Sequence, residues 1–207
     1  MLWIILAIIS SYLVGSLPTA FIFGRILKGI DIRNYGSGNV GATNAMRVLG
    51  KGPGITVLFL DIIKGFVVVV FLANLVSAKI SLLSGELLRI ILGVSCICGH
   101  NWSIFLGCKG GKGMAVTLGV LLGLAVKIAG LRIVLGSSII IWLIVFTVTR
   151  IVSIASVMSG ISLPIFMLLF KQSHTLIFLS ILLCLLVILR HKSNLKRVLQ
   201  GKERPLF

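Results

Sequence analysis

Residues 54–76 read GITVLFLDIIKGFVVVVFLANLV, an apolar run of 23 residues that holds one acid and one base. About 20 apolar residues in a helix are enough to cross a lipid bilayer. The whole chain is of this kind: 58% of its 207 residues are hydrophobic, only 12% are charged, and the mean hydropathy is +1.18. A soluble domain is nearer half apolar and a quarter charged. The composition therefore excludes a soluble globular protein and predicts an all-α integral membrane protein.

Seven apolar segments are bounded by charges or glycines, and each is predicted to be a transmembrane helix. They cover roughly residues 2–24, 54–76, 82–107, 113–130, 131–149, 152–170 and 174–190. Only residues 127–132 divide the fourth segment from the fifth, so these two could also form one interrupted segment. What remains is short re-entrant or interfacial loops, and we expect a single transmembrane domain over residues 1–207. The first segment lacks the basic start and cleavage site of a secretory signal and is expected to be a retained span.

The basic residues set the expected orientation. The chain has 20 Lys and Arg against 4 Asp and Glu, a net charge of +16. With the N-terminus outside, seven spans place the C-terminus in the cytoplasm, with 14 basic residues in inner segments and 4 in outer loops. This asymmetry is the one that the positive-inside rule describes. The charge therefore belongs to membrane loops next to lipid, and we expect no nucleic-acid partner.

The first of three polar stretches is residues 31–50, DIRNYGSGNVGATNAMRVLG. Its glycines let backbone amides turn into a concave site for anions, and Arg47 can hold a phosphate through two hydrogen bonds. The Gly36-Gly38-Gly41 spacing matches a dinucleotide fingerprint, but that motif needs a strand–turn–helix unit, and membrane spans flank it here. A glycine-rich loop that satisfies only its own backbone is the alternative. The candidate anion-binding residues are Ser37, Gly38, Asn39, Gly41, Thr43, Asn44 and Arg47.

The second stretch is residues 99–113, GHNWSIFLGCKGGKG. It is not a P-loop, because Gly113 follows Lys112 where Ser or Thr is required. Lys112 precedes a predicted helix whose N-terminus favours negative charge. His100 either supports this site or is simply a hydrogen-bonding residue between helices. The candidate residues of the loop are Gly110, Gly111, Lys112 and Gly113.

The third stretch is residues 190–204, RHKSNLKRVLQGKER. His191 and Asn194 are three apart and share a helix face where the last span leaves the membrane. His191 could accept a hydroxyl proton or hydrogen-bond a substrate. The other basic side chains are expected to meet anionic lipid. These are Lys196, Arg197, Lys202 and Arg204.

Two smaller features complete the candidate site. Asp61 and Lys64 are three apart inside the second span and are expected to pair and to support the site. Ser153 and Ser156 open the sixth span, where they either pack against a neighbouring helix or contact substrate. The four cysteines form no CxxC pair and the four acids are scattered, so we expect no metal and no cofactor.

Together these motifs resemble those of the bacterial acyl-phosphate:glycerol-3-phosphate acyltransferases. The resemblance rests on GSLPTAFIFGR, GSGNVGATNAMR, LDIIKG, GHNWSIFLGCKGGKG, SIAS and RHKSNLKR, which occur in the family's order from the first span to the tail. It implies a multi-pass enzyme of the bacterial plasma (inner) membrane, with seven spans and an active site that faces the cytoplasm. It also implies transfer of an acyl group from acyl phosphate to the sn-1 hydroxyl of glycerol 3-phosphate. The products are lysophosphatidic acid and phosphate, in phospholipid biosynthesis.

The resemblance implies catalytic roles for five residues of the three motifs. Ser37 and Arg47 match the first motif, Lys112 the second, and His191 and Asn194 the third; either Ser153 or Ser156 matches a further serine. The base is left open between His191 and an oxygen of a substrate phosphate. We favour the phosphate oxygen, with His191 and Asn194 orienting glycerol 3-phosphate. Cys108 and Met114 depart from the family, where an aromatic residue and a valine are usual.

Two other classes of function fit the composition. A transporter or channel for an anionic solute would also need spans with ionisable residues such as Asp61 and Lys64. Transporters often show inverted repeats and a midplane site, whereas here the polar stretches gather on one predicted face and no repeat is visible. A non-catalytic scaffold for lipid enzymes would not need so many hydrogen-bond donors. The sequence leaves the oligomeric state and the acyl-chain preference open.

Overall fold

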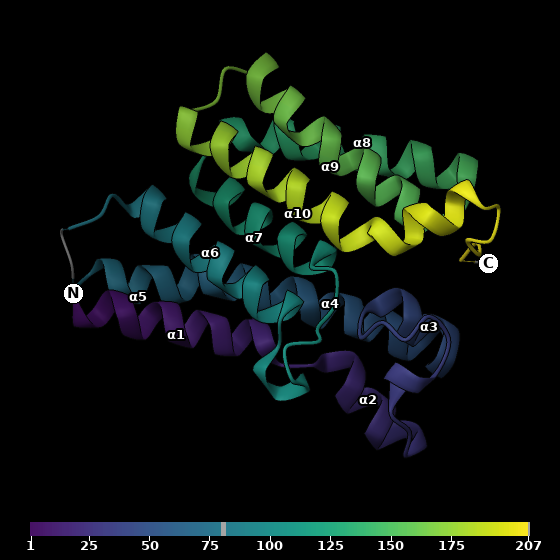
Figure 1. The fold of residues 1–207 in the computed structure, drawn as a ribbon. Coiled ribbons are helices and arrows are strands. Elements are labelled where there is room, and N and C mark those ends of the chain that lie inside the picture. The colour runs from purple at the N-terminus through teal and green to yellow at the C-terminus, as the bar shows by residue number, and fades with distance from the viewer. Residues whose placement is uncertain (80–81, 207) are drawn as a thin grey trace. The chain divides into compact units, whose positions relative to one another are not determined.

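The computed structural model describes residues 1–79 and 82–206, and all the regular elements in those ranges are helical. The helices gather into two compact units, Met1–Leu124 and Ala125–Phe207. Figure 1 shows the helices of each unit. This confirms the all-α prediction for the described part of the chain.

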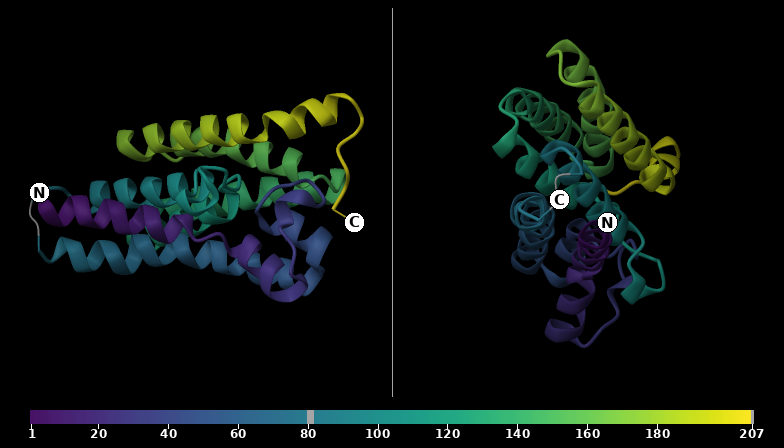
Figure 2. Two further views of the ribbon diagram at one scale, coloured as in Figure 1. Left: turned by 60° about the horizontal axis from the view of Figure 1, so that its bottom comes forward. Right: turned by 90° about the vertical axis from the view of Figure 1, so that its left-hand side faces the viewer.

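The first unit is built on long helical segments that run side by side, as Figures 1 and 2 show for α1, α6 and the continuous segment of α4 and α5. A π-turn at Val68–Leu72 joins α4 to α5, and single turns of 3₁₀-helix lie at Ile32–Asn34 and Ile104–Leu106. The α-helices are α1 (Leu2–Ser16), α2 (Thr19–Lys28), α3 (Ala42–Leu49), α4 (Lys51–Val67), α5 (Ala73–Ser77), α6 (Gly85–Asn101) and α7 (Met114–Lys127), the last of which runs on into the second unit.

The second unit packs α9 against both α8 and α10. The bounds are Gly130–Thr149 for α8, Val152–Leu169 for α9 and His174–Leu199 for α10. Trp142 Nε1 of α8 donates to Ser156 Oγ at 3.5 Å, and Ser159 Oγ of α9 donates to the Ser138 carbonyl at 3.0 Å. Serines thus join these two helices, as polar residues do between helices in lipid.

Two of the predicted segments differ in the structure, and one predicted division is confirmed. The predicted segment 2–24 is divided, because α1 ends at Ser16 and α2 begins at Thr19. Pro18 lies between them, and proline both lacks an N–H and disfavours the helical conformation of the residue before it. The predicted segments 113–130 and 131–149 are separate helices. The last segment does not end at residue 190, since α10 continues to Leu199.

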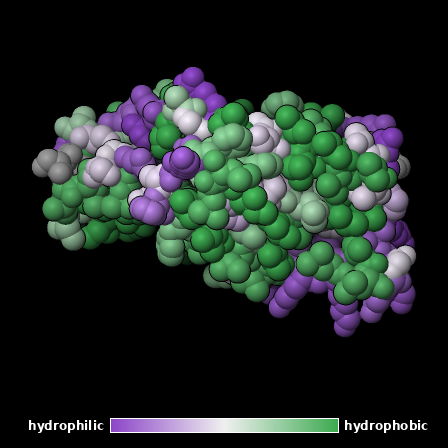
Figure 3. Space-filling model, turned by 90° about the horizontal axis from the view of Figure 1, so that it is seen from above, coloured by the Kyte–Doolittle hydropathy of each residue, from purple (hydrophilic) through white to green (hydrophobic). Residues whose placement is uncertain are grey.

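Six helical segments are long and apolar enough to cross a membrane. They are Leu2–Lys28, Lys51–Ser77, Gly85–Leu106, Gly130–Thr149, Val152–Leu169 and His174–Leu199. α7 is apolar but has 14 residues, a length of about 21 Å. The bilayer core is about 30 Å thick. The described residues therefore give six candidate spans and one shorter apolar helix. Large apolar side chains are exposed along these helices, and green surfaces dominate the face drawn in Figure 3.

Small residues let the helices of the first unit approach closely. A Cβ added to Gly15 or Gly99 of the α1–α6 contact would collide with a backbone carbonyl of the opposite helix. Between α4 and α7, a Cβ added to Gly65 or Gly119 would do the same. Glycine at such positions allows backbones to meet, which is the usual basis of helix association in lipid.

Candidate active site

The first polar stretch folds as a loop that its own Asn44 holds together. Asn44 is fully buried at the start of α3; its Oδ1 accepts from the Ser37 N–H at 2.8 Å, and its Nδ2 donates to the Tyr35 carbonyl at 3.1 Å. Gly36 has φ +61°, and a Cβ there would collide with Asn44 Oδ1. The Asn44 amide is therefore used inside the loop, where it positions the Ser37 and Gly38 backbone.

An apolar core fixes this loop and α3 in the first unit. Ala45 and Leu49 of α3 pack with Val40 and Ile32 of the loop and with Leu106 of the second polar stretch. Around this core, the other predicted residues remain accessible: Ser37, Gly38 and Arg47 are exposed, and Asn39, Gly41 and Thr43 are half-buried. The same apolar core therefore supports two of the three predicted motifs, the first and the second polar stretch.

At the start of this polar stretch, Asp31 forms a local ion pair with Arg33. Its carboxylate accepts from the Arg33 backbone N–H at 3.0 Å and pairs with Arg33 Nη2 at 2.7 Å. The Arg33 side chain lowers the pKa of the Asp31 carboxyl to about 2. Asp31 therefore stays ionised and fixes the turn before Ser37.

The second polar stretch is fastened to the end of α6. The Gly110 N–H donates to the Asn101 carbonyl at 3.2 Å, and the Gly111 N–H donates to the His100 carbonyl at 3.0 Å. A Cβ at Gly110 would collide with the His100 carbonyl, and a Cβ at Gly111 with His100 Nε2. The two glycines are thus required because the loop lies directly on α6.

Lys112 and Gly113 lead from this loop into α7. Gly113 has φ +80°, in the left-handed region, and its carbonyl accepts from the Thr117 N–H at 2.7 Å. Lys112 is half-buried, one residue before that turn. The lysine therefore lies beside a helix N-terminus, where the helix dipole attracts anions.

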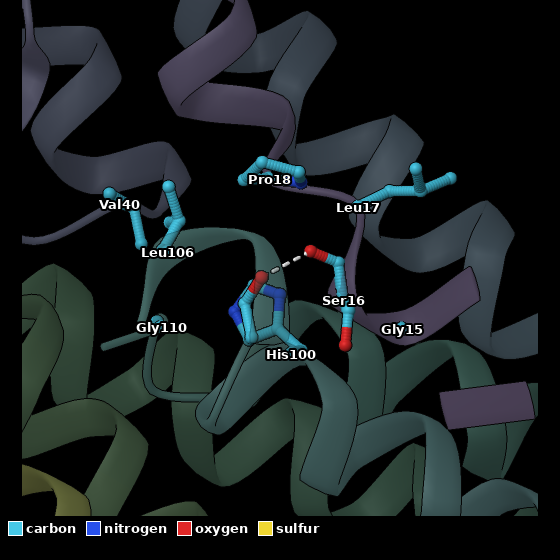
Figure 4. Close-up of a pocket in the computed structure, with 10 residues that line it drawn as sticks. Gly15, Ser16, Leu17, Pro18, Val40, His100, Leu106 and Gly110 are labelled. Carbon is cyan, nitrogen blue, oxygen red and sulfur yellow. Dashed lines mark hydrogen bonds between the residues drawn. The ribbon is translucent and has the colours of Figure 1, made fainter. Parts of the chain in front are cut away.

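A small pocket lies between the α1–α2 junction and this loop. Figure 4 shows Ser16, Leu17 and Pro18 on one side of it and Val40 and Leu106 on another. The full lining is Gly15, Ser16, Leu17, Pro18, Val40, His100, Ser103, Leu106, Gly110 and Gly111. Ser103 Oγ donates to the Ser16 carbonyl at 2.6 Å, which joins the two walls.

A buried charged network lies behind this pocket. The predicted pairing of Asp61 with Lys64 is present: Lys64 Nζ lies 2.9 Å from Asp61 Oδ1. The same ammonium contacts the Leu17 carbonyl at 3.1 Å and His100 Nδ1 at 2.9 Å, and Thr19 Oγ1 donates to Asp61 Oδ1 at 2.7 Å. The network links α4, the α1–α2 junction and α6.

In the second unit, His191 and Asn194 share one buried face of α10, as predicted. They are 3% and 5% exposed. His191 Nδ1 lies 2.8 Å from the Val187 carbonyl. A carbonyl only accepts, so Nδ1 carries the proton, and in the neutral ring Nε2 is an acceptor.

Glu203 organises this part of the second unit and was not among the predicted residues. Its carboxylate accepts from Ser153 Oγ at 3.1 Å, from Asn194 Nδ2, and from Arg197 Nε at 2.6 Å. Burial raises the pKa of the Glu203 carboxyl, but the hydrogen bonds from Asn194 and Arg197 outweigh it and leave the pKa below its usual value. Arg197, one of the residues expected to meet anionic lipid, pairs with Glu203; its contact with lipid stays a prediction.

The structure therefore distributes the predicted residues over both units. In the first, the motif residues lie on two loops that share a core, with His100 in the wall of the pocket and Asp61 and Lys64 behind it. In the second, Ser153 and Asn194 meet on Glu203, whereas Ser156 contacts Trp142 of α8. The one signal for Glu203 in the sequence was its rarity, as one of four acids in a strongly basic chain.

Comparisons with known proteins agree with the resemblance seen in the motifs. The family model described as Glycerol-3-phosphate acyltransferase matches residues 5–201. A glycerol-3-phosphate acyltransferase of Prochlorococcus marinus is 44% identical over 204 residues, which cover 98% of this chain and 97% of that protein. One of Halalkalibacterium halodurans is 38% identical over 205 residues, which cover 97% and 94%.

Two solved structures are also similar. The glycerol 3-phosphate form of PlsY (YgiH), an integral membrane glycerol 3-phosphate acyltransferase, gives a TM-score of 0.83 at 36% identity and covers 98% of this chain and 94% of that one. Its lysophosphatidic acid form gives 0.80 at 35% identity, with the same coverage. The fold is therefore shared with an integral membrane protein along nearly the whole chain.

Proposed function

This chain belongs to the glycerol-3-phosphate acyltransferase family, and we propose that it transfers an acyl group from acyl phosphate to the sn-1 hydroxyl of glycerol 3-phosphate. The products are lysophosphatidic acid and inorganic phosphate, which places the enzyme in phospholipid biosynthesis. The observation that carries the acyl-phosphate proposal is the glycine loop at Gly110–Gly113, which lies on α6 and leads past Lys112 to the N-terminus of α7. Such a loop suits a phosphate leaving group.

Acyl phosphate is a mixed anhydride, so its carbonyl carbon is already activated. The substrate hydroxyl attacks this carbon, the bond from carbon to the phosphate oxygen breaks, and phosphate leaves with the electron pair. The enzyme mainly aligns the two substrates and stabilises the developing charge. No covalent acyl-enzyme is required, and the hydroxyl proton passes to an oxygen of a substrate phosphate.

The first unit supplies the anion-binding groups of this proposal. Lys112 and the backbone of Gly110–Gly113 hold one phosphate, and Arg47 with Ser37 holds phosphate charge at the first loop. Gly38, Asn39, Gly41 and Thr43 line that loop, while Asn44 positions it through the bonds to Ser37 and Tyr35. Arginine and lysine suit these roles because both carry permanent donors for phosphate oxygens.

The second unit supplies residues that orient glycerol 3-phosphate. His191 and Asn194 share one face of α10, and Ser153 meets Asn194 on the Glu203 carboxylate. This contact favours Ser153 over Ser156 as the serine that contacts substrate. The Nδ1–H of His191 is directed at the Val187 carbonyl, so Nε2 can accept a hydrogen bond from a substrate hydroxyl.

We propose seven membrane crossings, with the N-terminus outside, the C-terminus in the cytoplasm, and the motifs at the cytoplasmic face of the bacterial plasma membrane. The basic residues support this orientation. α7 would be a short crossing, and a short apolar helix can be accommodated by local thinning of the bilayer.

Purified protein in lipid vesicles tests the proposed reaction. It would be incubated with palmitoyl phosphate or palmitoyl-CoA and labelled glycerol 3-phosphate, followed by analysis of lysophosphatidic acid. We expect product from palmitoyl phosphate alone and a loss of about 100-fold or more in Lys112→Ala. Lys109→Ala, a change of the exposed lysine on the same loop, is the matched control and should retain activity.

Product from palmitoyl-CoA instead would overturn the proposed donor. If folded protein formed no product from either donor, anion flux across the same vesicles would decide whether the chain is a transporter. Neither product nor flux would favour a scaffold.

A further inference from the structure

The helix α2 turns away from the direction of α1 at Pro18, and buried contacts hold this turn. Thr19 Oγ1 donates to Asp61 Oδ1 at 2.7 Å, and Lys64 Nζ donates to the Leu17 carbonyl at 3.1 Å. The right-hand view of Figure 2 looks nearly along α1 and shows α2 descending from its end. The direction of α2 is therefore fixed by side chains of α4, and α2 is not a straight continuation of the first span.

The lengths of the two helices place the end of α2 at the edge of the hydrocarbon layer. α1 has 15 residues and α2 has 10, which correspond to about 22 Å and about 15 Å of helix. The hydrocarbon core is about 30 Å thick, so α1 does not cross it alone and α2 completes the crossing. Arg25 and Lys28, in the last turn of α2, therefore lie at the depth of the phospholipid headgroups.

The outward face of α2 is apolar up to this depth. Ala20 and Gly24 are buried against the rest of the first unit, whereas Ile22 and Ile26, one turn apart on the opposite side of the helix, are 39% and 75% exposed. A helix with an apolar outer face and basic residues beside it is typical of the membrane interface. The two isoleucines thus lead from the depth of the acyl chains to Arg25.

The Phe21 ring holds two guanidinium groups beside this face. The Cζ atoms of Arg25 and Arg33 each lie 5.3 Å from the centre of the ring, which itself packs on the apolar core under the first polar stretch. Arg33 pairs with Asp31 at 2.7 Å, whereas Arg25 forms no ion pair among the residues that the structure describes. Because a cation–π contact leaves the N–H groups at the edge of a guanidinium accessible, Arg25 can bind an anion while Phe21 holds it in place.

We propose that Arg25 binds the phosphate of an anionic phospholipid headgroup, with Ile22 and Ile26 against the acyl chains of the same lipid. A guanidinium binds phosphate oxygens through two parallel hydrogen bonds, and the isoleucines match the apolar part of the molecule. Glycerol 3-phosphate and inorganic phosphate have no acyl chain, so they would leave the isoleucines without a partner. The proposal concerns lipid binding and does not depend on the acyl transfer.

The charges around Arg25 favour an anionic lipid over a zwitterionic one. Arg33 lies over the same ring, and Lys28 is held nearby, since its Nζ donates to the Val48 carbonyl at 2.6 Å. Asp31 is the one acid in residues 19–34 of the sequence. This surplus of positive charge predicts a preference for phosphatidylglycerol over phosphatidylcholine.

A tryptophan at position 26 reports which lipid lies beside Arg25. Ile26→Trp would be made in a chain whose three natural tryptophans are replaced by Phe, and the protein would be placed in bilayers with brominated phosphatidylglycerol or brominated phosphatidylcholine, which quench a tryptophan that they touch. One cation near the surface changes the affinity for anionic lipid about fivefold. We expect the binding constant for phosphatidylglycerol relative to phosphatidylcholine at position 26 to fall about fivefold in Arg25→Gln, and less in Arg25→Lys.

Ile144→Trp, at a position of α8 that is 54% exposed, is the matched control, and its lipid preference should not respond to Arg25→Gln. The proposal is overturned if the preference at position 26 changes less than twofold in Arg25→Gln. It is also overturned if glycerol 3-phosphate or inorganic phosphate abolishes that preference at matched ionic strength, because the site would then bind a soluble phosphate. If the chain without its natural tryptophans does not fold, native mass spectrometry of the unsubstituted protein and of Arg25→Gln decides: we expect one bound phosphatidylglycerol fewer in the variant, and equal numbers contradict the proposal.

Discussion

At the scale of single residues, the Glu203 carboxylate holds three side chains of the second unit together. It accepts from Ser153, Asn194 and Arg197, and its pKa lies below its ordinary value of 4.5. A carboxyl whose pKa is lowered on folding stabilises the folded state above its unfolded pKa, and the stabilisation is lost as the pH falls through the lower, folded-state value.

Glu203→Gln should therefore be less stable than the unsubstituted protein at pH 7, by about 2 kcal/mol for the lost charge-assisted hydrogen bonds. The difference should shrink as the pH falls below about 4.5, where the Glu203 carboxyl of the unfolded chain becomes protonated while that of the folded protein is still ionised. Thermal unfolding of both proteins in detergent at pH 7 and at progressively lower pH measures this. A pH-independent difference would contradict the role of the carboxylate charge.

Asn101 carries a buried amide that gives a second prediction at this scale. It is 1% exposed, and neither Oδ1 nor Nδ2 has a hydrogen-bond partner in the described structure. Buried polar atoms without partners cost about 1–3 kcal/mol. Asn101→Leu, which keeps the branched shape and the number of heavy atoms of the side chain, should raise the free energy of unfolding by about 1 kcal/mol, as measured by thermal unfolding. Asn101→Ala is the control for cavity formation and should be destabilising; a destabilised Asn101→Leu would show that the amide has a partner in solution.

The sequence predicted residue types and local pairs better than it predicted tertiary partners. The Asp61–Lys64 pair follows from a three-residue spacing on a helix. By contrast, Thr19 reaches Asp61 over 42 residues of sequence, and Ser153 reaches Glu203 over 50. Such contacts depend on how helices pack, which no local spacing encodes. The bonds of Asn44 to Ser37 and Tyr35 are likewise not visible in the motif, and its contact with substrate stays a prediction.

At the scale of helices, glycine decides where backbones meet. A Cβ on Gly119 of α7 would collide with the Ile62 carbonyl of α4, whereas a Cβ on Gly136 of α8 would meet nothing within 4 Å. Overpacking typically costs 1–3 kcal/mol, while alanine is preferred to glycine in an open helix by up to about 1 kcal/mol.

Gly119→Ala should thus destabilise the protein by about 2 kcal/mol, and the matched Gly136→Ala should leave its stability unchanged or raise it. Unfolding temperatures in one detergent provide the measurement. Equal effects from the two substitutions would mean that α4 and α7 do not meet at Gly119.

Helix positions followed from apolar runs, but the break at Pro18 and the extension of α10 to Leu199 did not. Spans predicted from hydropathy follow only the length of the apolar runs. The break at Pro18 depends instead on backbone geometry, and the end of α10 on a tertiary contact.

At the scale of the whole molecule, the distribution of basic residues predicts which loops face the cytoplasm. Lys79 lies in a predicted outer loop and Cys108 in a predicted cytoplasmic loop, and both side chains are exposed. Intact cells would be treated with a membrane-impermeant thiol reagent, using Lys79→Cys in a Cys108→Ser background and Cys108 in the otherwise unsubstituted protein. We expect labelling of position 79 in intact cells and of Cys108 only after permeabilisation.

The reverse pattern would invert the orientation and place the glycine loop outside. Phosphorylated substrates made inside the cell could then not reach Lys112, so the acyl transfer itself would be excluded at that loop. Labelling of both positions in intact cells would instead mean that the two loops lie on the same side, which requires an even number of crossings between them. Residues 82–107 form the one predicted span between these positions, and α6 is the helix found there. The labelling experiment thus tests the crossing by α6, on which the proposed cytoplasmic location of the site depends.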